Sequence, residues 1–154
     1  MKAIIVAGLA ALAASSIAPA FGQEAGVTVR SIRVLAADPE KAAVFYEKAF
    51  GMSETRRPVN TDTFKEIVIN SGSTAEKAKA AKSTPIVIAT RRNKDEKPLS
   101  MPALILEVPD MDKAVAAVVA AGGKGGKPAK SGEGLTYCMV ADNEGNPIEL
   151  LLKQ

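Results

Sequence analysis

The chain has 154 residues, a formal net charge of +3, no histidine and a single cysteine, Cys138. The lack of histidine excludes the commonest general base and the commonest ligand of transition metals, and a lone cysteine excludes an intramolecular disulfide. The slight positive excess lies in a chain with few aromatic residues, so the composition argues against a nucleic-acid partner.

The first 22 residues are typical of a secretory signal peptide. Lys2 is followed by an apolar stretch and then by small residues, and cleavage fits after Ala20 or after Gly22, of which we prefer Gly22. The apolar stretch is shorter than the roughly 20 residues that a membrane span needs. We therefore expect cleavage, export to the periplasm and no integral membrane segment in the mature chain.

Residues 23–154 are expected to form one domain made of two modules, and loss of Lys2 lowers the formal charge from +3 to +2. The first module, about residues 27–92, begins with a half-buried strand over 29–35. Asp38-Pro39 then starts a helix with one apolar face, to which Phe45 and Tyr46 belong, and Gly51 ends it. Further strands are predicted over 54–59, 64–70 and 85–90, with room for a short surface helix before the last of them.

The second module, about residues 101–154, repeats this order after a charged linker over 91–100. The arginine pairs in the chain, including Arg91-Arg92, are expected to be surface charge, although they could favour anionic ligands. A strand over 102–108 precedes a helix capped by Asp110. After a stretch rich in glycine and lysine, strands are predicted over 135–141 and 148–152, joined by a turn over 142–146.

The two modules are related by an internal repeat. Residues 38–42 align with residues 110–114 at an offset of 72, which also places Gly51 on Gly123. A single four-stranded curl with one helix leaves one face of its sheet uncovered, so two such halves must pack together. The predicted fold is α+β, with two βαβββ modules that form a curved mixed sheet.

Two motifs resemble the vicinal oxygen chelate superfamily, which includes glyoxalase I, the bleomycin-resistance proteins and the extradiol dioxygenases. The segment PEKAAVFYEKAFGM is similar to its opening helix, and DNEGNPIELLL is similar to its closing motif, with Asn143 where proline is usual. The resemblance covers almost the whole mature chain. It implies the paired-module fold, but this superfamily supports many reactions and also plain binding.

Metal-using members of the superfamily place four ligands inside the curved sheet. The resemblance puts these positions on Ser31, close to Ile88, on Ala103 and on Glu149. A single carboxylate does not hold a divalent ion, because protein sites use three or four ligands. We therefore expect no metal and no cofactor. The iron site of the dioxygenases, with two histidines and one carboxylate, cannot be built from this sequence.

Strand alternation predicts which side chains share the sheet face of Glu149. The predicted ligand-binding residues are Ser31, Arg33, Ile88, Ala103, Glu107 and Glu149, in a mostly aliphatic cavity. Three roles are open for Glu149. It pairs with Arg33 or a loop lysine as a relic of the family site, it accepts a hydrogen bond from a ligand, or it is a catalytic general base whose pKa is raised by aliphatic neighbours.

The sequence thus predicts an exported protein that binds a small, partly apolar molecule without metal. The alternative is a glyoxalase-like lyase or isomerase with Glu149 as its base, so whether the protein is an enzyme is open. Cys138 is expected to be a core thiol, because no histidine is present to activate it. The resemblance also implies a homodimer, since related proteins often dimerise through their sheets.

Overall fold

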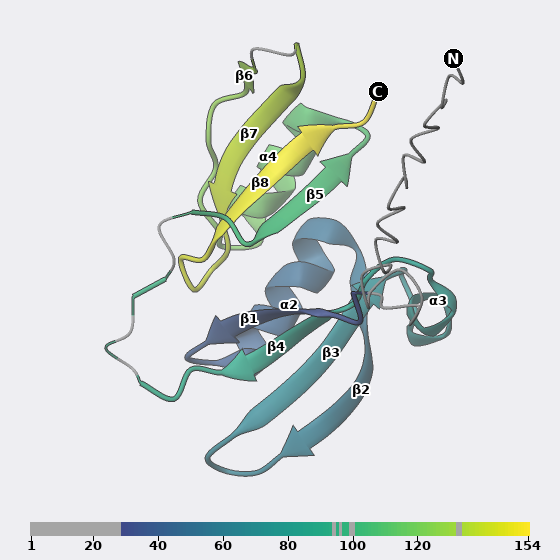
Figure 1. Ribbon diagram of the computed structural model, residues 1–154, viewed down its shortest axis with the longest axis vertical. Coiled ribbons are helices and arrows are strands. Elements are labelled where there is room, and N and C mark those ends of the chain that lie inside the picture. Colours follow the sequence, from purple (N-terminus) through teal and green to yellow (C-terminus); the bar gives the residue numbers. More distant parts are fainter. Residues whose placement is uncertain (1–28, 94, 96, 99–100, 132–133) are drawn as a thin grey trace, which may run out of the picture.

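The computed structural model describes residues 29–93, 95, 97–98, 101–131 and 134–154, so the predicted signal peptide lies outside the described residues. The chain forms two four-stranded sheets, each built from one half of the sequence (Figure 1). No helix in the described ranges is long and apolar enough to cross a bilayer.

The first module contains four strands and two helices. The strands lie in the order β1-β4-β3-β2, with β1 and β4 parallel and the other neighbours antiparallel. The elements are β1 (Ile32–Ala36), α2 (Pro39–Phe50), β2 (Met52–Asn60), β3 (Lys65–Ser71), α3 (Ala75–Ala80) and β4 (Ile86–Thr90).

The second module repeats this arrangement with one helix. Its strands lie in the order β5-β8-β7-β6, and β5 and β8 are the parallel pair. The elements are β5 (Leu104–Val108), α4 (Met111–Ala120), β6 (Ala129–Lys130), β7 (Thr136–Ala141) and β8 (Pro147–Leu152). The two mixed sheets and their helices confirm the predicted α+β fold of two βαβββ modules. The short strand β6 lies in the segment that the sequence marked only as rich in glycine and lysine.

Local sequence signals explain where the two main helices begin and end. The side chain of Asp38 accepts a hydrogen bond from the backbone N–H of Lys41 at 3.1 Å, and Asp110 does the same for Lys113 at 3.0 Å. After α2 the left-handed residue is Gly51, with φ of 62°, as predicted. After α4 the residue with positive φ is Gly122, with φ of 92°, one residue before Gly123, on which the 72-residue offset places Gly51.

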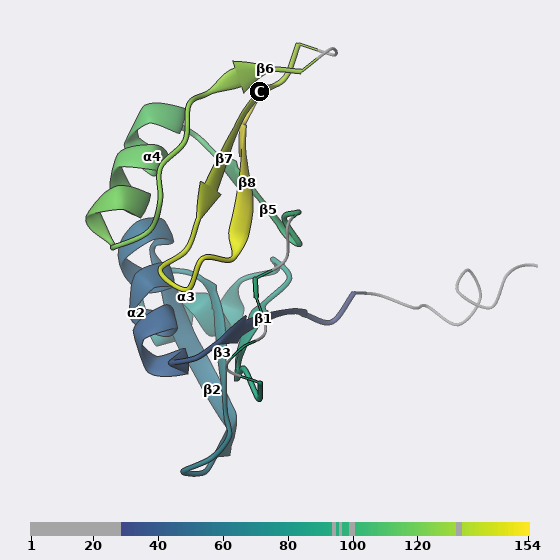
Figure 2. The ribbon, with the colours of Figure 1, turned by 90° about the vertical axis from the view of Figure 1, so that its left-hand side faces the viewer.

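Helices α2 and α4 pack together and cover one face of both sheets (Figure 2). On the opposite face, called the open face because α2 and α4 leave it uncovered, the short helix α3 packs against β2 and β3. The apolar side chains of the covered face form one core that runs through both modules. Cys138 belongs to this core, as predicted; it is fully buried, and burial raises the pKa of its thiol.

The register of β4 corrects one prediction. Ile88 lies opposite Val34 of β1 and is fully buried in the helix-covered core. Val87 lies opposite Arg33, so it is Val87 that shares the open face with Arg33. The predicted face of β4 is therefore wrong by one residue. All four residues from Ile86 to Ala89 are buried, and a strand buried on both sides carries no alternation from which its face can be read.

Candidate functional site: a pocket at the junction of the modules

The turn that precedes β8 connects the two modules through Asp142, whose side chain is buried. Its Oδ1 accepts hydrogen bonds from the backbone N–H groups of Glu144 and Asn146, at 2.9 and 2.8 Å. Its Oδ2 accepts from the Tyr46 hydroxyl at 3.1 Å and from Asn146 Nδ2 at 2.8 Å. The two sequence motifs, one from each module, thus meet at a single carboxylate.

Tyr46 reaches this carboxylate from helix α2 and is fully buried. Burial raises the pKa of Tyr46 well above its usual value, and the neighbouring negative charge and hydrogen bond of Asp142 raise it further. The phenol therefore stays protonated and donates to Asp142. The prediction that Tyr46 belongs to helix packing is confirmed, and its hydroxyl contributes in addition to the docking of the second module.

The same turn also binds the end of β1. The carboxylate of Glu144 accepts from the backbone N–H of Ala37 at 2.8 Å, beside the N-terminus of α2. Asn146 Nδ2 donates to the carbonyl oxygen of Leu35 at 3.2 Å. These contacts fix the position of the second module relative to β1 and so define the space between them.

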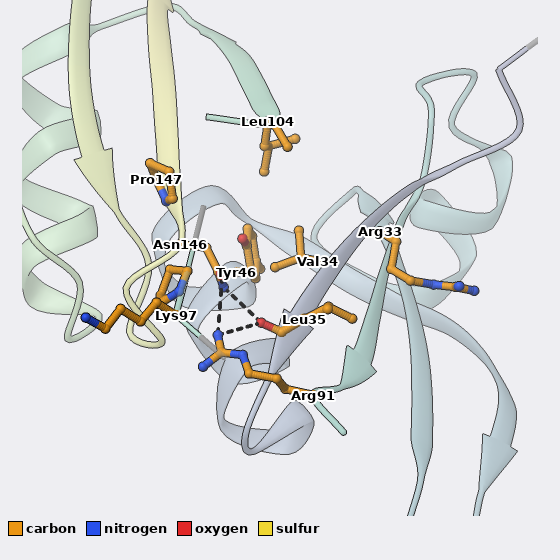
Figure 3. Close-up of a pocket in the computed structure, with 11 residues that line it drawn as sticks. Arg33, Val34, Leu35, Tyr46, Arg91, Lys97, Leu104, Asn146 and Pro147 are labelled. Atoms are coloured by element: carbon orange, nitrogen blue, oxygen red, sulfur yellow. Dashed lines mark hydrogen bonds between the residues drawn. The ribbon is translucent and has the colours of Figure 1, made fainter. Parts of the chain in front are cut away.

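That space holds a pocket of about 160 Å³ (Figure 3). Leu35 and Ala103 come from the open face of the sheets, whereas Tyr46 comes from the helix side, so the pocket passes between the two modules. Most of its wall is apolar, formed by Val34, Leu35, Pro98, Ala103, Leu104 and Pro147.

Arg91 supplies the buried charge of the pocket. Arg91 is only 9 % exposed, and its Nη2 donates to the carbonyl oxygen of Leu35 at 3.1 Å and to Asn146 Oδ1 at 3.5 Å (Figure 3). Within the described part of the chain no carboxylate lies within ion-pair distance of Arg91. The expectation that Arg91 is surface charge is therefore wrong.

The six predicted ligand-binding residues do not form one cluster. Arg33 and Ala103 line the junction pocket, and Ile88 lies in the core. Ser31 is exposed just before β1. Glu107 and Glu149 lie on β5 and β8 of the second sheet, and neither lines the junction pocket.

Glu149 lies on the open face of the second sheet. It is half-buried and stands opposite Ile105 of β5 and Met139 of β7, which are themselves exposed. The pair with Arg33, one of the three roles left open for Glu149, does not form, because Arg33 instead binds Glu66 of its own module at 2.8 Å. No lysine or arginine among the described residues pairs with Glu149 either.

Comparison with known families decides the classification. A family profile described as a glyoxalase-like domain matches residues 30–151. The protein belongs to the glyoxalase-like family. It is thus a member of the vicinal oxygen chelate superfamily, as its two motifs suggested. No protein with a curated description matches the sequence.

Solved structures support the fold of this glyoxalase-like protein. A hypothetical protein from S. aureus has a TM-score of 0.61 at 22% identity, with 82% of this chain and 95% of that chain covered. A glyoxalase/bleomycin resistance protein/dioxygenase superfamily member from Sphaerobacter thermophilus has a TM-score of 0.64 at 19% identity, covering 82% and 98%. A domain of the same description from Frankia sp. has a TM-score of 0.63 at 13% identity, covering 83% and 98%.

The four positions that hold metal in other members of the superfamily do not fit a metal in this glyoxalase-like protein. Ile88 and Ala103 have no donor atoms in their side chains, and Glu149 stands on the open face without a second carboxylate opposite it. In the residues that the structure describes, no group of three or more histidine, cysteine, aspartate or glutamate side chains could hold an ion.

Proposed function

We propose that this glyoxalase-like protein binds a small, partly apolar molecule in the junction pocket, without a metal. The observation that supports the proposal is a mostly apolar pocket into which two polar groups, Arg91 and Asn146, converge. Its volume of about 160 Å³ is close to that of an apolar cavity of ~150 Å³ that takes up benzene. A ligand of that size, well below a drug-sized molecule, is therefore expected.

Filling the pocket tests this proposal. Ala103→Phe places a ring in the cavity and is expected to weaken binding of small aromatic and aliphatic probes at least ~10-fold, as measured by ligand-observed NMR. Ala80→Phe is the matched control, since Ala80 is exposed on α3 and does not line the pocket. Probe binding that is unchanged in Ala103→Phe would contradict the proposal.

Glu149→Gln separates binding from catalysis in the same experiment. The second candidate function is a lyase or isomerase in which Glu149 transfers a proton, and its half-buried, unpaired carboxylate among apolar neighbours favours this role. Because Glu149 does not line the pocket, we expect Glu149→Gln to leave probe affinity within about twofold. A substrate that the wild type converts and Glu149→Gln binds without turnover would instead establish the enzyme.

The proposal also includes export to the periplasm, a homodimer and the lack of a metal. The composition of residues 1–22 supports export to the periplasm, and the exposed Ile105 and Met139 on the open sheet face support association of two copies through that face. Native mass spectrometry of the chain purified from the periplasm is expected to give a metal-free dimer whose subunits begin at Gln23. A retained leader would contradict export, a monomer would contradict the homodimer, and a stoichiometric metal would contradict metal-free binding.

A further inference from the structure

The charge of Arg91 has no counter-ion in the described protein. We propose that the junction pocket takes a small organic monocarboxylate, of up to about the size of benzoate, whose carboxylate binds the guanidinium of Arg91. The inference rests on the pocket being a binding site and adds the chemical class of the ligand.

Arg91 is a cation that the fold has withdrawn from water. A charged side chain that is withdrawn from water is destabilising unless an opposite charge or several hydrogen bonds compensate for it. Arg91 is 9 % exposed, and both of its side-chain hydrogen bonds leave from one nitrogen, Nη2, to neutral acceptors on Leu35 and Asn146. A bound anion would supply the missing charge.

The guanidinium of Arg91 also has donors that the protein leaves free. A guanidinium carries five N–H donors, and those on Nε and Nη1 of Arg91 have no acceptor among the described residues. Neither nitrogen is sealed from solvent, because the one buried side-chain atom without a partner in the described chain is Asn143 Oδ1. Arg91 therefore keeps three free N–H donors, one on Nε and two on Nη1, for an anionic acceptor such as a carboxylate.

The described charged residues of the pocket wall are all basic. Its charged lining residues are Arg33, Arg91 and Lys97, with no acid among the described lining. Figure 3 shows the side chain of Arg33 directed away from the pocket, where it binds Glu66, and the amine of Lys97 ending on the outer side. One buried positive charge thus faces the cavity, which favours a singly charged ligand over a phosphate dianion.

The apolar residues of the pocket wall indicate the chemistry of the ligand beyond its carboxylate. Val34, Leu35, Leu104 and Pro147 offer apolar contacts and no further charge, so a compact hydrocarbon portion fits beside the carboxylate. Asn146 holds the guanidinium in place, because its amide is itself fixed by bonds to Leu35 O and Asp142 Oδ2. A donor that is held in position before the ligand arrives costs less entropy on binding.

The experiment compares acids with their neutral amides. Acetate, butyrate, hexanoate and benzoate are titrated into the full-length mature protein beside acetamide, butyramide, hexanamide and benzamide, and affinity is measured by ligand-observed NMR at fixed ionic strength. At least one acid is expected to bind ~10-fold or more tightly than its amide, because hydrogen bonds to charged groups are the stronger kind. The ratio of acid to amide affinity is measured on the wild-type protein alone and does not depend on a variant that folds.

Two variants then assign the preference to Arg91. Arg91→Met is expected to remove most of the acid-over-amide preference, with a loss of ~10- to 100-fold in acid affinity. Arg92→Met has the same change of net charge at the next residue, which is exposed and lies over the Phe64 ring at 5.0 Å, and it is expected to keep the preference within about twofold. Should Arg91→Met fail to fold, Arg91→Lys retains the charge but loses the Nε and Nη1 donors of the guanidinium, so the acid-over-amide preference is expected to fall.

The outcomes separate the two proposals. Equal affinity for acids and amides, both lost in Ala103→Phe, overturns the carboxylate inference and leaves the binding function intact. An acid preference that falls equally in Arg91→Met and Arg92→Met reports surface charge and also overturns it. Binding of no probe by the wild type overturns both proposals.

Discussion

Replacing Asp142 with alanine is expected to lower the free energy of unfolding by about 3–4 kcal/mol, because the buried carboxylate is the shared acceptor of the closing turn. It accepts four hydrogen bonds, from the Tyr46 hydroxyl, the Glu144 N–H and two groups of Asn146. Alanine would leave the fully buried Tyr46 hydroxyl without its acceptor. Chemical denaturation monitored by circular dichroism measures the change.

A double-mutant cycle shows whether the loss occurs at the contact between modules. Tyr46→Phe removes only the hydroxyl, so its effect should be ~1–2 kcal/mol in the wild type and close to zero in Asp142→Ala. Asp110→Ala is the matched control, since Asp110 is a helix cap outside the junction, and it should cost about 1 kcal/mol. Additive effects of the two junction variants would show that Tyr46 and Asp142 do not stabilise each other.

Gly123→Ala is expected to destabilise the protein by about 3 kcal/mol through steric overlap. A Cβ at this position would lie 2.5 Å from the carbonyl oxygen of Ala141 and 2.7 Å from Cε2 of Phe45. The carbonyl cannot withdraw, because Ala141 and Lys124 exchange two backbone hydrogen bonds of 2.9 Å. Since Phe45 belongs to the first module and Ala141 to the second, the substitution would push the modules apart.

Gly122→Ala is the control for backbone conformation. Gly122 has a φ of 92°, but a methyl group added there would meet nothing within 4 Å, so alanine should cost ~1–2 kcal/mol from conformation alone. Hydrogen exchange distinguishes the two variants: the amides of Lys124 and Ala141 should lose protection in Gly123→Ala and keep it in Gly122→Ala. Unchanged protection in both variants would contradict the close approach at Gly123.

Local signals account for what the sequence predicted well. Caps such as Asp38 and Asp110 bind a backbone N–H three residues away, so a short window of sequence contains both partners. The 72-residue repeat predicted that the second module has the same order of elements as the first. The turn over 142–146 was placed correctly because its polar and glycine residues form hydrogen bonds mostly within the turn. These features depend little on the rest of the chain.

The pocket could not be predicted in the same way. Arg91 meets Leu35 and Asn146, which lie 56 and 55 residues away, and no pattern along the chain marks a cation that becomes buried by such a meeting. The pair of Arg33 with Glu149, one of the three roles left open for Glu149, does not form for a related reason. Arg33 of β1 lies opposite Val87 of β4, and Glu66 of β3 lies opposite Ala89 of the same strand. Both side chains therefore point to one face of the first sheet, where they form an ion pair, whereas Glu149 lies on the second sheet.

The separation of the two sheets has a consequence for how the chain reaches its native state. Each sheet closes within one contiguous half of the sequence, whereas the contact of Tyr46 with Asp142 spans 96 residues. Loop-closure entropy makes such distant contacts slow to form, so each half should collapse on its own and docking should come last. Substitutions at Asp142 are then expected to accelerate unfolding and to leave the refolding rate nearly constant.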